Sequence, residues 1–292
     1  MEKISVIMSI YNEPIELIKK AIDSILRQTY SEFEFLIVND NPDRKSNAEL
    51  LQFYNSRDSR VLPIYNENNI GLTKSLNKAV FQSSGDYIAR MDADDISDVN
   101  RFQKQISFFK KNNDVHICAT FVKVIDKFDN ELDLIKSPTK DLNIKSKLFF
   151  RNCISHPTVM YRREMIIDLG GYTESVSKAQ DYDLWVRALI SGYSFHIISE
   201  PLLKYRVHDN NISTIYINEQ DAFASKAKLN LHNNFISDGD VESFVRQVDS
   251  NKKIIGLIRG FSYLIRLSFN IKKRFPKFNR AMFICNGIKR IL

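Results

Sequence analysis

The sequence predicts an α/β fold, with a mostly parallel sheet and helices on its flanks. Over roughly the first ninety residues, short apolar runs alternate with segments whose apolar residues recur at helical spacing, which is the pattern of β-α-β crossover units. The first of these runs is apolar on both faces, as a buried parallel strand is. Polar residues gather directly after the runs, where open α/β sheets bind ligands.

Strands and helices alternate strictly in this first part of the chain. Pro14 follows the first apolar run and suits the first turn of a helix. The expected strands cover residues 5–10, 33–38, 61–65 and 87–91, and the expected helices follow Pro14, lie at 48–54 and follow Gly71.

The second part of the chain is less regular. A polar connection through Pro138 is expected after the strand at 115–124, and the loops between about residues 127 and 151 carry no readable motif. The remaining periodic segments predict helices at 101–110, at 163–169 and from Gln180, and strands at 115–124, 158–161 and 195–198.

The bulk properties fit a cytoplasmic protein of 292 residues with one large domain, or one domain with an appendage. The three cysteines have no paired spacing, so neither a disulfide framework nor a zinc site is indicated. The N-terminus lacks the layout of a signal peptide. No apolar stretch reaches the roughly 20 residues that span a bilayer.

The positive charge is concentrated at the C-terminus. Residues 252–292 contain eleven Lys or Arg and no acid, whereas the preceding 251 residues carry 31 basic and 35 acidic groups. Apolar residues interleave with these cations, which predicts an amphipathic helix lying on an anionic membrane. The alternative is a helix packed on the main domain with a solvated basic face. Nucleic acid is not expected as a partner, because no recognition motif accompanies the charge.

Three carboxylates, Asp92, Asp94 and Asp95, follow the strand expected at 87–91. They repel one another unless a cation neutralises them, and Mg²⁺ or Mn²⁺, bound through oxygen and shared with a substrate phosphate, is the usual solution. The alternative is a helix N-terminus, because Asp94, Asp95, Ser97 or Asp98 could cap the helix that follows.

Other strand ends carry polar residues too, namely Tyr11, Asn12 and Glu13 after the first strand and Asp40 after the second. Together they predict a ligand crevice at one edge of the sheet. The chain has neither a Walker loop nor a G-x-G-x-x-G fingerprint, so ATPase and dinucleotide folds lose support.

Read together, these residues resemble the family 2 glycosyltransferases, which are inverting nucleotide-sugar enzymes of the GT-A fold, and in particular those of bacterial surface polysaccharides. The matching stretches run in the family's order across roughly residues 4 to 210. They are 6–13, 22–30, 69–72, 85–95, 156–159 and 181–185.

The resemblance implies a donor site for a UDP-sugar. Asp92 and Asp94 would be the D-x-D pair that places Mn²⁺ or Mg²⁺ on the diphosphate, where the metal acts as a Lewis acid on the leaving group. Asn39 stands where many members have a second aspartate beside Asp40, which is a mild departure. The residues implied to bind the donor nucleotide are Tyr11, Asn12, Glu13, Asp40, Asn69, Lys74, Asp92 and Ala93.

The resemblance also implies a catalytic base, Asp181. An inverting transfer needs a carboxylate that takes the proton of the acceptor hydroxyl as this oxygen attacks the anomeric carbon. Gln180 stands where many members have Glu, which removes a like charge but keeps the base. The alternative for Asp181 is an N-cap of the helix that follows.

Four further residues are candidates on the basis of the resemblance. His208 matches a histidine that reaches the metal or the diphosphate in related enzymes, against the alternative of an exposed histidine without function. Arg206 is expected to pair with phosphate. His156 is expected to shape the acceptor side or to stabilise a turn, and Trp185 is either a core residue or an acceptor platform.

These features lead to one functional hypothesis. The chain is expected to be a metal-dependent inverting glycosyltransferase that moves a hexosyl or N-acetylhexosaminyl group from a UDP-sugar to a glycan hydroxyl, on a polyprenyl-diphosphate-linked acceptor at the inner face of the plasma membrane. A nucleotidyltransferase is the alternative enzyme, but it predicts a Gly-rich basic loop after the first strand. A non-catalytic scaffold is disfavoured by the acids at 92, 94 and 181.

The hypothesis also implies a division of the chain into domains. Residues 1–215 form the catalytic domain, with a nucleotide-binding half at 1–95 and an acceptor half at 96–215. Residues 216–292 form a helical extension.

Overall fold

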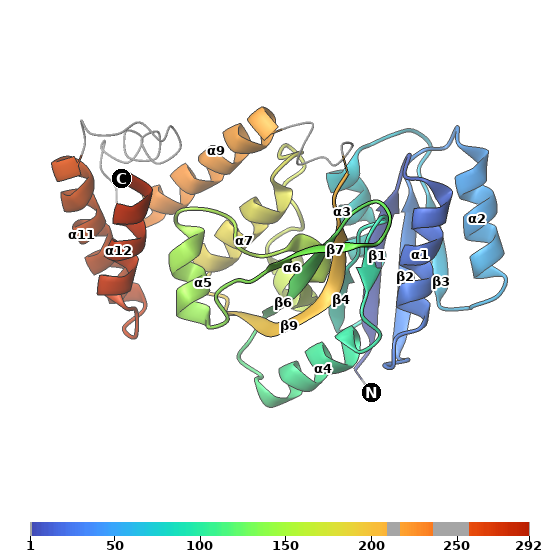
Figure 1. The fold of residues 1–292 in the computed structure, drawn as a ribbon, viewed down its shortest axis with the longest axis horizontal. Helices are drawn as coiled ribbons and strands as arrows, with labels where there is room; N and C mark the ends of the chain where they lie inside the picture. Colours follow the sequence, from blue (N-terminus) through green and yellow to red (C-terminus); the bar gives the residue numbers. More distant parts are fainter. Residues whose placement is uncertain (1, 209–216, 236–256, 292) are drawn as a thin grey trace.

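The computed structural model describes residues 2–208, 217–235 and 257–291. Within them, nine strands form one sheet in the order β3-β2-β1-β4-β8-β6-β9-β5, with β7 paired to β6 (Figure 1). The expected α/β fold is confirmed. The first four strands pair in parallel in the order β3-β2-β1-β4, and they are β1 (Ile4–Ile10), β2 (Phe33–Asn39), β3 (Val61–Tyr65) and β4 (Tyr87–Arg90).

The second part of the sheet is mixed. Strand β8 pairs antiparallel with both β4 and β6, while β6 and β9 run parallel. The second part therefore continues the same sheet, but its strands run in mixed directions. Its strands are β5 (Ile96–Ser97), β6 (Ile117–Ile125), β7 (Glu131–Ile135), β8 (Met160–Arg162) and β9 (Phe195–Arg206).

Helices cover both faces of the sheet because successive side chains of each strand point to opposite sides. One buried cluster joins alternate residues of β1 and β2 to α1 (Ile15–Leu26), α2 (Lys45–Asn55) and α4 (Arg101–Lys111). The other cluster covers the opposite face. Its helices include α3 (Leu72–Gln82), α5 (Asp141–Leu148), α6 (Arg163–Asp168) and α7 (Gln180–Ile190).

The first crossover shows why the sequence folds this way locally. The carbonyl of Pro14 accepts the first helical bond, from the N–H of Ile18 at 3.1 Å. The buried residues of α1 then recur at helical spacing and include Ile18, Ala21, Ile22 and Ile25. Gly71, which precedes α3, has a φ of 84°, a conformation that glycine adopts without steric cost.

The C-terminal helices pack onto the second part of the chain. Leu231 of α9 (Ile217–Phe235), Leu264 and Leu267 of α11 (Leu257–Arg274) and Phe283 of α12 (Arg280–Ile291) are fully buried in the same cluster as Trp185. In Figure 1 these helices occupy the end of the molecule opposite α1 and α2. Part of the apolar face that was expected to meet a membrane is therefore covered by protein.

The basic face of these helices remains open to solvent. Arg266, Lys272, Lys273 and Lys277 are exposed, and the ring of Phe269 among them is 48% exposed. Residues 252–256 of the predicted membrane-binding segment, and the expected domain boundary at 215–216, lie outside the described residues. None of the helices in the described ranges is long and apolar enough to cross a membrane.

The expectation of a polar connection through Pro138, with loops between about residues 127 and 151, is wrong. This stretch contains β7 and α5. Every residue of β7 is exposed, so the strand has no buried side whose period could be detected. Few of the residues of α5 are apolar and buried, chiefly Ile144 and Leu148.

Two strand predictions differ from the structure. The strand expected at 195–198 continues as β9 to Arg206, because the ladder with β6 resumes after an irregularity around Pro201. The strand expected at 158–161 begins later, at Met160, since a single 3-10 turn occupies His156–Thr158.

Candidate active site

Strand β1 has β2 on one side and β4 on the other. The chain runs from β1 to β2 and β3 first and reaches β4 only afterwards, so its direction across the sheet reverses between β1 and β4. This is the switch point of the sheet, where open α/β folds bind ligands. The backbone fixes the strand ends, because Met91 N–H donates to the Ile7 carbonyl at 3.1 Å and Asp40 N–H donates to the Ile10 carbonyl at 2.9 Å. The segment 11–13, Asp40 and the acid cluster therefore meet at one edge.

The three carboxylates of the cluster turn to three different partners. Asp92 pairs with the buried guanidinium of Arg90. Asp94 Oδ2 lies 3.1 Å from His208 Nε2. Asp95 Oδ1 accepts the backbone N–H of Arg206 at 2.8 Å.

These partners decide against capping as the role of Asp94 and Asp95. Asp98 instead accepts the N–H of Asn100 at 2.9 Å, directly before α4. Burial, followed by repulsion from Asp92, raises the pKa of Asp94, and the bond with His208 opposes this shift. Burial and then repulsion from both neighbouring acids raise the pKa of Asp95 well above its usual range.

Arg206 is fully buried beneath this cluster. Its Nε donates to the Asp94 carbonyl at 2.8 Å and its Nη1 to the Asp126 carbonyl at 2.8 Å, while Nη2 lies 2.6 Å from Asp129. In this position Arg206 holds the backbone of Asp94 and the carboxylate of Asp95 in place. A direct contact with phosphate would require the guanidinium to leave these partners.

Glu13 joins the first strand end to the acids. Its carboxylate accepts the N–H of Tyr11 at 2.7 Å. Burial raises its pKa, and the charges of Asp94 and Asp92 act in the same direction. Tyr11 is 40% exposed, and Asn12 Oδ1 accepts a bond from Asn41 at 2.7 Å.

Asp40 is buried and braces the loop before α3. It accepts the N–H groups of Ile70 and Gly71, both at 2.9 Å, and the side-chain amide of Asn66 at 2.8 Å. Asn69 Oδ1 bonds the N–H of Gly71 at 3.0 Å. Two further expected donor residues differ in exposure, since Lys74 is exposed on α3 and Ala93 is buried.

Asp181 lies in the first turn of α7, two residues after the helix cap at Ala179. It is therefore not the cap itself. Its Oδ2 accepts a bond from the Asn152 amide at 2.7 Å. Burial raises the pKa of Asp181, and the charge of Asp92 also raises it. Asp92 thus acts on carboxylates of both halves of the site.

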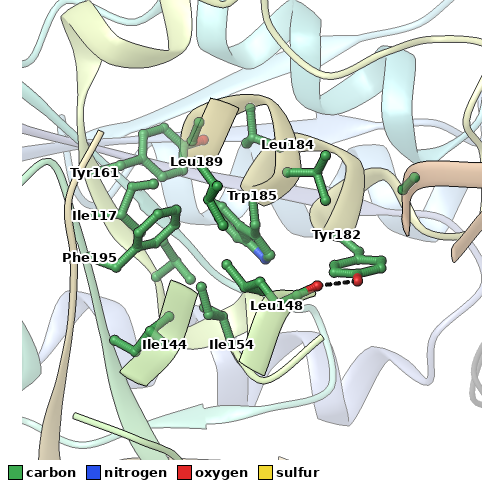
Figure 2. Packing of buried hydrophobic residues seen from close by; sticks show 14 of the residues in the cluster. Ile117, Ile144, Leu148, Ile154, Tyr161, Tyr182, Leu184, Trp185, Leu189 and Phe195 are labelled. Atoms are coloured by element: carbon green, nitrogen blue, oxygen red, sulfur yellow. Dashed lines mark hydrogen bonds between the residues drawn. The ribbon is translucent and has the colours of Figure 1, made fainter. Parts of the chain in front are cut away.

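The rings of His156 and Trp185 lie close together, with their centroids 6.1 Å apart. His156 Nε2 is 2.9 Å from the hydroxyl of Tyr172, and burial, with the charge of Arg90, lowers its pKa well below the usual range. The ring of Trp185 is fully buried among Leu148, Ile154 and other core residues (Figure 2). An acceptor platform needs an exposed ring face, so of the two roles expected of Trp185 the structure supports the core residue.

Comparison with known proteins identifies the family. The model of the family described as "Glycosyl transferase family 2" matches residues 5–170. The chain belongs to this family.

Three relatives agree with this assignment. The uncharacterized glycosyltransferase MJ1057 of Methanocaldococcus jannaschii is 39% identical over 73% of this chain and 74% of its own length. The O-antigen biosynthesis glycosyltransferase WbnJ of Escherichia coli is 35% identical over 72% and 82%. An E. coli UDP-Gal:alpha-D-GlcNAc-diphosphoundecaprenol beta-1,3-galactosyltransferase is 30% identical over 70% and 74%.

The GT-A fold is also that of a solved structure. S. aureus TarS 1–349, in complex with UDP-GlcNAc, superposes with a TM-score of 0.62 at 15% identity, over 99% of this chain and 88% of TarS 1–349. Against the longer TarS chain the match covers 54% of that chain.

In this family 2 glycosyltransferase, Asp94 and His208 are the side chains that could hold a divalent cation. Asp94 Oδ2 and His208 Nε2 lie close enough to share one ion. Within the described ranges no group of three or more Asp, Glu, His or Cys side chains has metal-binding geometry. A site with few protein ligands still fits Mg²⁺, which often keeps waters and substrate phosphates among its ligands.

Sequence reasoning missed two residues of this glycosyltransferase site, Arg90 and Asn152. Arg90 is 1% exposed, and its Nε and Nη1 have no hydrogen-bond partner among the described residues. A cation inside an apolar strand was a detectable signal, because buried charges are nearly always paired. Asn152 carried no such signal, since its partner lies 29 positions away.

Proposed function

We propose that this glycosyltransferase is metal-dependent and inverting, and that it moves a sugar from a UDP-sugar to a hydroxyl of a glycan acceptor. The observation that carries the proposal is the position of Asp92. Burial is the main reason why the pKa values of Glu13, Asp94 and Asp181 are raised, and the charge of Asp92 adds to the shift in all three. Such coupling brings a nucleotide crevice and a half-buried carboxylate into one site, as transfer chemistry requires.

Three strand-end residues would bind the nucleoside of the donor. The exposed ring of Tyr11 offers a face for the base, Glu13 a carboxylate for the ribose, and Asp40 an acceptor for a uracil imide. Asp40 is already oriented by three donors, so its carboxylate is fixed before the nucleotide arrives. The structural likeness to TarS, which was solved in complex with UDP-GlcNAc, supports a uridine nucleotide.

Asp94 and His208 would hold Mn²⁺ or Mg²⁺ against the diphosphate. When bound, the metal neutralises the charge that develops on the leaving UDP. Asp92, paired with Arg90, stays beside this position as a further acid facing the donor.

Asp181 would accept the proton of the acceptor hydroxyl while the oxygen attacks the anomeric carbon. The hydroxyl oxygen forms the new glycosidic bond, the bond to UDP breaks with its electron pair going to the phosphate oxygen, and the anomeric configuration inverts. The raised pKa of this half-buried carboxyl brings its basicity closer to neutral pH than that of an exposed aspartate.

The proposed acceptor is a polyprenyl-diphosphate-linked glycan of a bacterial O-antigen, capsule or exopolysaccharide. WbnJ is named for O-antigen biosynthesis, and the E. coli galactosyltransferase is named for a diphosphoundecaprenol-linked GlcNAc. The exposed cations of α11 and the segment after it would hold the enzyme at the cytoplasmic face of the membrane. Each basic residue near an anionic surface contributes about 1 kcal/mol to such binding.

The decisive experiment incubates the protein with a panel of UDP-sugars, Mn²⁺ and an undecaprenyl-diphosphate-linked N-acetylhexosamine. We expect release of UDP together with a lengthened glycan whose new linkage has the configuration opposite to that of the donor. Retention of configuration would contradict the inverting mechanism. Release of pyrophosphate from a nucleoside triphosphate, without sugar transfer, would identify a nucleotidyltransferase instead.

Membrane binding has a separate test. Lys272, Lys273 and Lys277 are exchanged for alanine together, and binding to vesicles with anionic lipid is measured by sedimentation. We expect a loss of roughly 100-fold in vesicle affinity, from about 1 kcal/mol per residue. A matched variant that removes the exposed Lys110 and Lys111 of α4 serves as control. Equal losses in both variants would refute a specific basic face.

A further inference from the structure

We propose that Asn152 is the positioning residue of the catalytic base: its side-chain amide holds the carboxylate of Asp181 in one orientation and in its ionised form. This inference rests on the proposed function, in which Asp181 accepts the proton of the acceptor. Asn152 lies in the segment between α5 and the turn at His156, outside every motif that identifies the family here.

The geometry leaves the Asn152 amide only one orientation. Its Oδ1 accepts the backbone N–H of Ile154 at 3.0 Å, so that end of the amide must be the oxygen. The Nδ2 group therefore faces Asp181 and donates to its Oδ2 at 2.7 Å. A flipped amide would place an N–H against an N–H and an oxygen against a carboxylate, and would lose both bonds.

The segment that carries Asn152 is held from the side of α7. The hydroxyl of Tyr182, the neighbour of the base, donates to the carbonyl of Leu148 (Figure 2). Figure 2 also shows Leu148 and Ile154, which flank the Asn152 segment, packed around Trp185 one turn further along α7. The helix that supplies the base and the segment that supplies the amide are thus joined by a hydrogen bond and by core packing.

The C-terminal helices hold the same segment from the other side. His232 of α9 is buried, and its Nε2 lies 2.9 Å from the carbonyl of Phe149, while its Nδ1 lies 2.8 Å from the hydroxyl of Tyr263 on α11. A segment held on two sides keeps the donor of Asn152 aimed at the base. Preorganised donors of this kind need no rearrangement during the reaction.

The charged groups around Asp181 explain why a neutral donor matters here. Asp92, from the end of β4, repels the carboxylate, and Tyr172, from the loop after α6, lies near it. On α7 itself, Asp183 already bonds Arg187 at 2.8 Å.

Two charged or titratable groups on the neighbouring helices bond other partners. On α5, Lys145 bonds Asp141 at 2.9 Å, and on α9 the imidazole of His232 faces the carbonyl of Phe149. Backbone N–H groups of the first turn of α7 and the amide of Asn152 therefore stabilise the charge. Burial opposes them and raises the pKa, so loss of the amide raises it further.

The test replaces the donor without changing the shape of the side chain. Asn152→Asp retains an oxygen for the N–H of Ile154 but sets a second carboxylate against Asp181, whereas Asn152→Leu removes the donor. The matched control is Asn112→Asp, because Asn112 is similarly buried, also donates through Nδ2, to the Phe108 carbonyl at 2.8 Å, and lies at the end of α4.

We expect the acidic limb of the transfer rate against pH to move upward by about one pH unit or more in both Asn152 variants, and more in Asn152→Asp. The base works only when ionised, so the loss of rate is greatest at low pH and shrinks as the pH rises through the new pKa. The control variant should keep the wild-type profile. A profile that stays in place while the rate falls equally at every pH would reduce Asn152 to a structural role and overturn the proposal.

A second readout does not depend on catalysis. Carboxyl ¹³C chemical shifts of aspartate-labelled protein give the pKa of Asp181 directly, with Asp181→Asn to assign the signal. We expect the same upward shift in the Asn152 variants. If the wild type transfers no sugar, the proposed function fails, and this titration still decides the contact between Asn152 and Asp181. An unchanged Asp181 titration would refute the inference even in an active enzyme.

Discussion

Asp92 and Asp181 belong to one site but are held in different ways. Asp92 follows β4, whose backbone pairs with β1 on one side and β8 on the other, and its carboxylate pairs with Arg90, two residues before it. Asp181 begins a helix, and its carboxylate is held by Asn152, which reaches it from 29 positions away. The backbone of the sheet thus places Asp92, whereas a side chain from another segment holds the carboxylate of Asp181.

This difference shows where each half is vulnerable. In the donor half the backbone ladder places several polar residues at once, so a single side chain can change without moving the others. In the acceptor half the base depends on a chain of contacts that includes Leu148, Phe149 and Asn152. Loss of any one of these contacts is expected to displace the base.

The largest expected effect tests the acceptor half. Asp181→Asn keeps the shape of the side chain but removes the base, so turnover should fall by about 10²–10⁴-fold, the usual contribution of a general base. The affinity for UDP, measured by calorimetry, should stay unchanged because the nucleotide residues lie in the other half. Asp183→Asn on the same helix, which loses its pair with Arg187, is the control and should retain most of the turnover. Equal losses in both variants would remove Asp181 from its role.

A second prediction tests the donor half. Asp94→Asn should lower turnover by about 10²–10³-fold, the scale on which the loss of one group that stabilises developing charge is felt. The Mn²⁺ concentration needed for half activity should rise with it, as should that of His208→Gln. Asp98→Asn, which loses only a bond from the N–H of Asn100, is the matched control. Full activity of wild type in the presence of a chelator would contradict the metal role.

A third prediction asks whether the C-terminal helices stabilise the acceptor half. Leu267→Ala on α11 leaves a cavity in the cluster shared with Trp185 and should cost about 2–5 kcal/mol of unfolding free energy. The control, Leu132→Ala, removes a side chain that is 59% exposed and should change little. Denaturant unfolding followed by the fluorescence of the single tryptophan measures both. An unchanged Trp185 transition in Leu267→Ala would mean that the helices unfold independently.

The smallest expected effect concerns Glu34, at the far end of the donor half from the acids. It is buried, which raises its pKa, but bonds from Lys3, Ser5 and Ser84 outweigh burial and lower the pKa to about 2. A depressed folded pKa stabilises the fold above the ordinary value of 4.5, and this stabilisation is lost as the pH falls toward 2. Glu34→Gln should therefore cost about 2 kcal/mol at pH 7.

The control for this variant is its pH dependence. At pH 3 the wild type has lost part of the same stabilisation, so the difference between wild type and Glu34→Gln should shrink. Urea unfolding at the two pH values measures it. A difference that stays constant or grows toward low pH would show that Glu34 does not act through its charge.

Sequence reasoning reached most of the donor half because its signals are local. The alternation of apolar runs predicted β1 to β4 and their helices, and the polar residues after each strand predicted the crevice. The acids at 92 and 94 stand directly at a strand end, so their position follows from the parallel sheet.

The acceptor half was harder to predict because its signals depend on tertiary contacts. Asp181 was reached only through the resemblance to the family. Strand β7 is exposed on both faces, and Pro201 interrupts the pattern of β9, so neither element shows a regular period. Asn152 is one of many asparagines, and only the fold reveals that it faces an acid.

The buried His232 limits how this enzyme could be re-engineered. Exchange of C-terminal segments is an obvious route to a new acceptor or a new membrane, since the residues proposed to bind the donor, His208 included, all lie before the C-terminal helices. But His232 holds the carbonyl of Phe149, three residues before the amide that faces the base. A chimaera with a foreign C-terminal segment would inherit the donor site intact and still have a misplaced base, unless the graft also supplies a histidine at this junction.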